Sequence, residues 1–163
     1  AMNLYIFRHA DAEIRDDEKF PDDNMRTLVK KGRNKTEKIA KFLKKRKVKV
    51  SLILTSPSLR SLEAAKLIRK ELDLPKEQLV QLDCLLPGGS NAELITEIKE
   101  KYVVDALLVV GHDPNLSLLI SQLVTGTPDL PIDLKKGGLC KLAVDELADG
   151  KCAKLELLLT PNF

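Results

Sequence analysis

The chain has no tryptophan, and aromatic residues make up only 4% of its 163 residues. Proteins that bind single-stranded nucleic acid stack bases on aromatic side chains interleaved with basic ones, so this scarcity argues against a nucleic-acid partner. The sequence also lacks an apolar run of the ~18 residues that a membrane-spanning helix needs, and it lacks a signal-peptide profile. We therefore expect a cytoplasmic protein with no membrane partner.

Cysteine is also scarce, and its placement excludes two classes of protein. Cys84, Cys140 and Cys152 are widely spaced and form no C-x-x-C pair, which argues against a disulfide framework and against a zinc site. The remaining composition, with 44% hydrophobic and 31% charged residues, is ordinary for a globular protein. The length suits a single domain covering residues 1–163, with one continuous core.

Charge is unevenly distributed although the net charge is only +3. Residues 11–23 are mostly acidic, whereas residues 30–49 are dense in lysine and arginine. Small and apolar residues recur in the basic stretch at helical spacing: Gly32, Thr36, Ile39, Ala40 and Leu43. We interpret the basic residues as the solvated face of an amphipathic helix, with Thr27 as the nearest cap. A docking surface for an acidic protein or nucleic acid is the alternative.

Short apolar runs alternate with segments of helical periodicity along the chain. Buried strands are predicted at residues 3–7, 52–54 and 106–110, and a short strand at residues 78–82. Two further runs, residues 139–144 and 153–159, flank Asp149-Gly150, which is a strong signal for an antiparallel hairpin. This alternation predicts an α/β fold, a three-layer α/β/α sandwich with a mixed, mainly parallel sheet.

Three of the predicted strands end at residues that can carry chemistry. These strand ends are Arg8-His9, Ser56-Pro57 followed by Arg60, and Gly111-His112. Ser56 is a good N-cap and Pro57 a good first helical residue, which puts Arg60 in the first turn of a helix. Because the carboxyl ends of parallel strands meet at one edge of a sheet, both histidines and both arginines are expected to share one crevice.

Two guanidinium groups and two imidazoles in one crevice suit phosphoryl transfer. The arginine fork binds phosphate oxygens bidentately, and its positive charge keeps a neighbouring imidazole neutral. His9 can then attack phosphorus in line and form a phosphohistidine intermediate, which water cleaves, while His112 donates to the phosphoryl oxygens. We expect the two rings to face each other across a gap the size of a tetrahedral group, with no metal or other cofactor.

The same segments resemble the histidine phosphatase superfamily, whose hallmarks are an Arg-His-Gly tripeptide, a later Ser-Pro-x-x-Arg and a distal histidine. The matching segments are Arg8-His9-Ala10, Ser56-Pro57-Ser58-Leu59-Arg60 and Gly111-His112. Arg26-Thr27-Leu28 with Gly32 resembles a further family segment, Arg-Pro-Leu-Thr-x-x-Gly. The compact size is most similar to that of the small SixA-like phosphohistidine phosphatases.

The resemblance implies a phosphoglycerate mutase-like fold and assigns roles to four residues. It makes His9 the phosphoacceptor, and Arg8, Arg60 and His112 the phosphate pocket. Ala10 replaces the commoner glycine, a small change that still allows close approach.

The general acid is the least defined part of the predicted site. Relatives that act on phosphate esters carry a glutamate after the third strand, whereas here Asp83, Glu93 and Asp11 are candidates that no pattern selects. An imidazole leaves more easily than an alkoxide, so the missing acid favours phosphohistidine on a partner protein as the substrate. The alternatives are a small-molecule phosphomonoesterase and a module that binds phosphorylated partners without turnover.

Other residues near the motifs have competing interpretations. Arg26 and Asp113 are candidates for substrate binding, although Arg26 is expected chiefly to brace the acidic loop at residues 11–26. Arg60 also has the spacing to pair with Glu63 on the same helix. Asp11 and Asp113, each close to a histidine, suggest a metal site, which the neighbouring arginines disfavour because they repel a cation.

Overall fold

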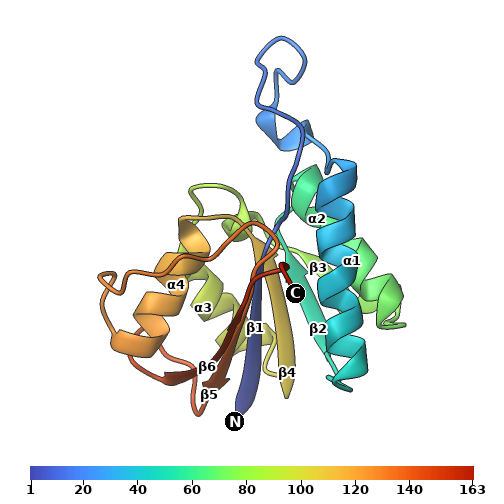
Figure 1. The fold of residues 1–163 in the computed structure, drawn as a ribbon. Coiled ribbons are helices and arrows are strands. Elements are labelled where there is room, and N and C mark those ends of the chain that lie inside the picture. Colours follow the sequence, from blue (N-terminus) through green and yellow to red (C-terminus); the bar gives the residue numbers. More distant parts are fainter.

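The computed structural model describes residues 1–163 and contains one six-stranded sheet (Figure 1). The strands are β1 (Met2–Arg8), β2 (Leu52–Thr55), β3 (Leu79–Gln81), β4 (Ala106–Gly111), β5 (Leu139–Val144) and β6 (Ala153–Leu159). They lie in the order β3-β2-β4-β1-β5-β6. The first four pair in parallel, whereas β5 pairs antiparallel with both β1 and β6. The predicted mixed, mainly parallel sheet is confirmed.

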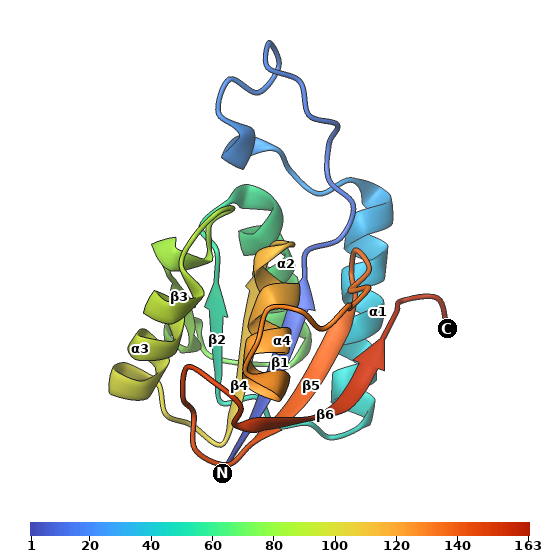
Figure 2. The ribbon, with the colours of Figure 1, turned by 90° about the vertical axis from the view of Figure 1, so that its left-hand side faces the viewer.

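Helices cover both faces of the sheet, which gives the predicted three layers (Figures 1 and 2). They are α1 (Lys30–Lys45), α2 (Leu59–Glu71), α3 (Asn91–Lys101) and α4 (Asn115–Thr125). Alternation along β1 divides the core: Leu4 and Ile6 pack with α3 and α4, whereas Tyr5 and Phe7 pack with α1 and α2. None of the helices combines the length and apolar character that a membrane crossing requires.

The amphipathic interpretation of α1 is confirmed. The buried residues of this helix are the five predicted ones, Gly32, Thr36, Ile39, Ala40 and Leu43. Gly32 allows an especially close approach, because a Cβ there would lie 2.0 Å from the main-chain oxygen of Asp11. The first turn of α1 therefore packs directly against the chain that leaves His9.

Two predicted helix starts are wrong. The helix α2 begins at Leu59 after Ser58, not at Pro57, because the Ser56 hydroxyl contacts the ring of His112 and the main-chain nitrogen of Ser58. The helix α1 follows Val29, which makes no side-chain cap, so Thr27 does not cap it.

Residues 11–29, here called the arm, connect β1 to α1 and rise beyond the carboxyl ends of the strands (Figures 1 and 2). Main-chain contacts join the two legs at the base: Ala12 bridges Leu28, and the Glu13 nitrogen donates to the Thr27 oxygen at 2.8 Å. A short 3-10 helix, η1 (Asp23–Met25), lies on the returning leg. The predicted loop is thus an ordered segment built directly onto the end of β1.

Candidate active site

The ends of β1 and β4 bring the two histidines together. The strands are neighbours, their register places Arg8 opposite Gly111, and the His9 nitrogen donates to the Gly111 oxygen at 3.1 Å. The ring centroids of His9 and His112 lie 5.0 Å apart with an interplanar angle of 65°. This edge-to-face contact leaves no room for a tetrahedral group between the rings. In contrast to the expected gap, the space for a ligand lies beside both rings.

A pocket of about 250 Å³ lies at these strand ends. All four residues predicted to form the site line it, namely Arg8, His9, Arg60 and His112. The two residues predicted for substrate binding, Arg26 and Asp113, line it as well. Arg15 from the arm and Lys136 from the segment before β5 complete its charged wall, and sequence reasoning did not single out either. The pocket therefore carries several cations and a single carboxylate, which suits an anionic ligand.

Arg60 is a buried guanidinium fixed by the arm. Its side chain is only 3% exposed, and it donates from Nη1 to the Asp23 main-chain oxygen at 2.8 Å and from Nη2 to Asp23 Oδ2 at 3.3 Å. Its Nε is buried and has no hydrogen-bond partner. A buried donor without a partner costs about 1–3 kcal/mol. The alternative pairing with Glu63 does not occur, because Glu63 accepts from the Leu28 nitrogen.

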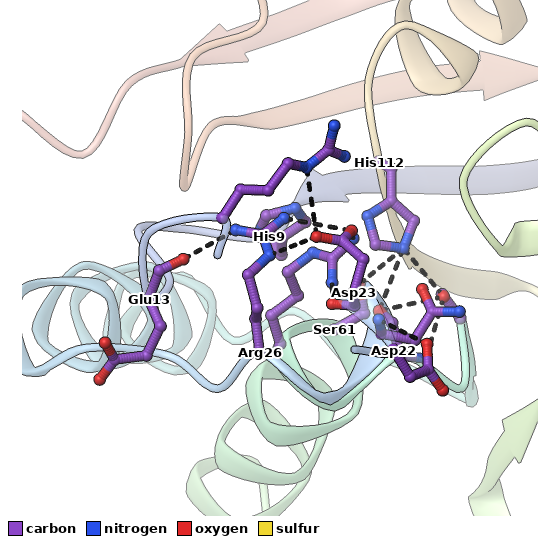
Figure 3. A network of polar contacts seen from close by, with 12 residues as sticks. His9, Glu13, Asp22, Asp23, Arg26, Ser61 and His112 are labelled. Carbon is purple, nitrogen blue, oxygen red and sulfur yellow. Dashed lines mark hydrogen bonds and ion pairs between the residues drawn. The ribbon is translucent and has the colours of Figure 1, made fainter. Parts of the chain in front are cut away.

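Asp23 on η1 joins three arginines of the pocket, and sequence reasoning missed it. Its carboxylate accepts from Arg26 Nε at 2.7 Å, from Arg15 Nε at 3.3 Å and from Arg60 Nη2 at 3.3 Å (Figure 3). The hydrogen bond from Arg26 and the charges of the arginines lower the pKa of Asp23 to about 2. Arg26 also donates to the Glu13 oxygen at 2.8 Å, so it braces the arm as expected while lining the pocket.

The geometry defines which nitrogen of His9 is free. Nδ1 lies 2.8 Å from the main-chain oxygen of Ala10. Because a carbonyl oxygen can only accept, Nδ1 carries the proton and donates, and Nε2 keeps its lone pair. Burial lowers the pKa of His9 to about 4, and the charges of Arg60 and Arg8 act in the same direction, against the hydrogen bond to Ala10. His9 is therefore neutral near pH 7, as a nitrogen nucleophile must be.

His112 is held by serine hydroxyls. Its Nε2 lies 2.9 Å from Ser56 Oγ, 3.1 Å from Ser58 Oγ and 3.4 Å from Ser61 Oγ. Burial, followed by the influence of His9 and Arg60, lowers the pKa of His112 to about 3. When a serine donates to Nε2, the proton of the neutral ring resides on Nδ1, the nitrogen on the side of His9 (Figure 3). In that tautomer His112 presents a hydrogen-bond donor beside the nucleophilic ring.

None of the three general-acid candidates lines the pocket. Asp11 lies at the base of the arm, where Lys35 Nζ contacts its carboxylate at 2.7 Å. Asp83 belongs to a short 3-10 helix after β3, and Glu93 lies in the first turn of α3. No carboxylate among them is placed to protonate a leaving group.

The two aspartates that suggested a metal site are engaged elsewhere. Asp113 accepts from the Ser117 nitrogen at 2.9 Å and from the Ser117 hydroxyl at 2.8 Å. Asp11 is paired with Lys35. No three His, Cys, Asp or Glu side chains are grouped so that they could hold a metal ion.

The chain is similar to known proteins in both sequence and structure. A family model, the histidine phosphatase superfamily (branch 1), matches residues 4–83. An uncharacterized protein of Picosynechococcus sp. is 33% identical over 143 residues, which cover 86% of this chain and 84% of the relative. The phosphohistidine phosphatase SixA of Escherichia coli is 27% identical over 152 residues, 91% of this chain and 89% of the relative. A solved structure of the protein histidine phosphatase SixA complexed with tungstate superposes with a TM-score of 0.81 and 26% identity, covering 98% of this chain and 97% of the other.

Proposed function

Because the chain belongs to the histidine phosphatase superfamily as a SixA-like phosphatase, we propose that its substrate is phosphohistidine on another protein. One observation carries this choice. The pocket contains a nucleophilic ring nitrogen and several cations, but it offers no carboxylic acid that could donate a proton. Its one lining carboxylate, that of Asp113, accepts two hydrogen bonds from Ser117. An ester substrate needs a proton for its departing alkoxide, whereas an imidazole protonated at its other nitrogen departs as a neutral ring.

The first step transfers the phosphoryl group to the enzyme. Nε2 of His9 attacks phosphorus, and the bond from phosphorus to the substrate imidazole breaks, leaving phospho-His9. The guanidiniums of Arg8 and Arg60, which line the pocket, bind the phosphoryl oxygens. The His9 proton stays on Nδ1, which donates to the Ala10 oxygen throughout, and the attacking Nε2 carries no proton, so no base is needed.

The second step returns the enzyme to its starting state. Water attacks phosphorus, the bond to Nε2 of His9 breaks, and inorganic phosphate leaves. In both steps charge spreads over the phosphoryl oxygens, where the Nδ1 proton of His112 stabilises it. The serines that contact Nε2 of His112 orient this donor.

The proposal is tested by comparing substrates under identical conditions. We expect efficient phosphate release from a phosphohistidine-carrying protein, and much slower release from sugar phosphates, nucleotides and phosphoserine peptides. A clear preference for esters would refute the substrate class and favour a small-molecule phosphomonoesterase. Tight binding of phosphohistidine protein without phosphate release would instead identify a binding module.

A further inference from the structure

A second basic pocket adjoins the catalytic pocket across Arg8. It has a volume of about 360 Å³, and none of its lining residues is hydrophobic. Its charged lining residues are Arg8, Lys35, Asp133, Lys135 and Lys136. Arg8 and Lys136 line both pockets, so one cationic wall separates the two spaces.

Arg8 holds the segment that carries the lysines, residues 133–138, here called the lysine loop. Its main-chain nitrogen donates to the Gly138 oxygen at 3.1 Å, and its oxygen accepts from the Gly137 nitrogen at 3.0 Å. Its Nη1 donates to the oxygen of Leu134, a buried residue, at 2.9 Å. Main chain and side chain of one residue therefore position the loop, and the pocket is built before any ligand arrives.

Gly137 lets the lysine loop lie close to the body of the protein. Its φ is +74°, a conformation that favours glycine, and a Cβ there would lie 3.3 Å from both Lys35 Cβ and Pro161 Cγ. This contact closes the pocket between the lysine loop, α1 and the segment after β6.

The charges of the pocket are only partly neutralised. Lys35 pairs with Asp11 at 2.7 Å, and Lys135 pairs with Asp133 at 2.6 Å. Arg8 and Lys136 make no ion pair, and the Nε of Arg8 is buried without a hydrogen-bond partner. The uncompensated positive charge thus lies on the wall that the two pockets share.

We propose that this second pocket binds an acidic side chain of the protein that carries the phosphohistidine. The proposal rests on the proposed function: the phosphoryl group occupies the catalytic pocket while a neighbouring carboxylate reaches Lys136 on the other side of Arg8. The arm offers an acidic group less free positive charge, because its exposed cations Arg15 and Lys19 are paired with Asp23 and Glu13, and its outer turn also exposes Asp16, Asp17 and Glu18. Lys136, which makes no ion pair, is therefore the better partner for a second anion of the substrate.

The test compares two phosphohistidine peptides that differ only beside the phosphorylated residue. One carries aspartate and glutamate there, and the other carries asparagine and glutamine. A charge-assisted hydrogen bond to Lys136 predicts about tenfold higher kcat/KM for the acidic peptide. K136Q should bring the ratio close to one, whereas the control K154Q, which changes an exposed lysine on the outer strand β6, should preserve it.

Phosphoimidazole, which has no flanking residue, separates failure of this inference from failure of the proposed function. Hydrolysis of phosphoimidazole by the parent enzyme with equal use of both peptides, or an unchanged ratio in K136Q, overturns the second pocket alone. No hydrolysis of phosphoimidazole or of either peptide overturns the proposed function and this inference with it. A preference for a bisphosphorylated small molecule over both peptides, abolished in K136Q, would assign the pocket to a phosphate and refute the acidic side chain.

Discussion

His9 and His112 are in edge-to-face contact, with ring centroids 5.0 Å apart. Two protonated rings at this distance would repel each other, and burial lowers the pKa of both, to about 4 and about 3. Both rings are therefore neutral at neutral pH and carry their proton on Nδ1, so His9 keeps a lone pair on Nε2 while His112 accepts a serine hydrogen bond at Nε2. The lone pair on His9 Nε2 and the N–H donor at His112 Nδ1 are therefore available in the same pocket.

The protonation of both rings can be measured directly, because the chain contains only two histidines. At pH 6 we expect both rings to be neutral, with the His9 proton on Nδ1, since the Ala10 oxygen accepts from that nitrogen. Long-range nitrogen–proton correlation spectra of the imidazoles report both tautomer and charge, and His9→Gln assigns the signals. If either ring of the folded protein titrated with a midpoint near pH 6.5, burial would not lower its pKa.

Replacing the nucleophile should separate turnover from anion binding. His9→Ala should abolish phosphate release and the phosphoenzyme, while tungstate binding is partly retained because Arg8 and Arg60 remain. His112→Asn should still form the phosphoenzyme, about 10²–10³-fold more slowly, because one donor to the phosphoryl oxygens is lost. Rapid-quench detection of acid-labile phosphoenzyme distinguishes the two. Unchanged phosphate release in His9→Ala would remove this residue from the mechanism.

Asp23 should act as a positioning residue for Arg60. Asp23→Asn keeps the main-chain oxygen that accepts from Arg60 Nη1 but removes the charge shared by three arginines. We expect kcat to fall about tenfold with a smaller change in KM. A displaced Arg60 guanidinium destabilises the transition state, in which charge develops on the phosphoryl oxygens, more than it destabilises the bound substrate.

The matched control is Asp22→Asn at the adjacent position, where the carboxylate accepts only from the Asn24 nitrogen. It should leave kcat nearly unchanged. If both variants lower kcat equally, or if Asp23→Asn changes only the unfolding midpoint, then Asp23 has a purely structural role.

Stability should fall as the pH is lowered from about 6.5 towards 4. In this window the unfolded chain binds protons at both histidines, whose ordinary pKa is 6.5, while the folded protein keeps them neutral. Stability therefore decreases with falling pH by about 1.4 kcal/mol per pH unit for each proton. Asp23 does not contribute here, because its stabilisation is lost only below pH 3.8, towards its pKa of about 2.

Urea unfolding at pH 7.5, 5.5 and 4.5 measures the free energy of unfolding across this window. In His112→Asn the unfolded chain takes up one proton fewer, so the free energy of unfolding should fall less steeply as the pH is lowered. A parent protein with equal stability at pH 7.5 and pH 4.5 would show that the folded histidines titrate normally.

The strands and the buried face of α1 were predictable because they follow local patterns. Short apolar runs that end in glycine or charge locate β1 and β4, and a 3.6-residue period locates Ile39 and Leu43 on the inner face of α1. The start of α2 was not predictable in this way. Ser56 and Pro57 satisfy the rules for a helix start, but the Ser56 hydroxyl contacts His112, which is distant in sequence.

The supporting residues of the site lacked a local signal. Asp23 lies among several aspartates in a segment without periodicity, and only its contacts with three arginines distinguish it from Asp22. Ser58 and Ser61 are three residues apart at the start of α2, so the sequence predicts that they share one face of the helix. It does not predict that His112 contacts both of them. Residues that act through tertiary contacts become visible only when the chain is folded.

The register of β1 against β4 has a consequence for how this protein can change. Because Arg8 lies opposite Gly111, the reacting pair is attached to two interior strands of the sheet, whereas the arm and the lysine loop extend beyond the strand ends. Grafting the lysine loop from a relative should thus change substrate choice and leave the reaction intact, whereas a grafted arm must keep Asp23, which holds Arg60. Substrate choice can therefore change at the lysine loop while the catalytic histidines stay fixed by the sheet.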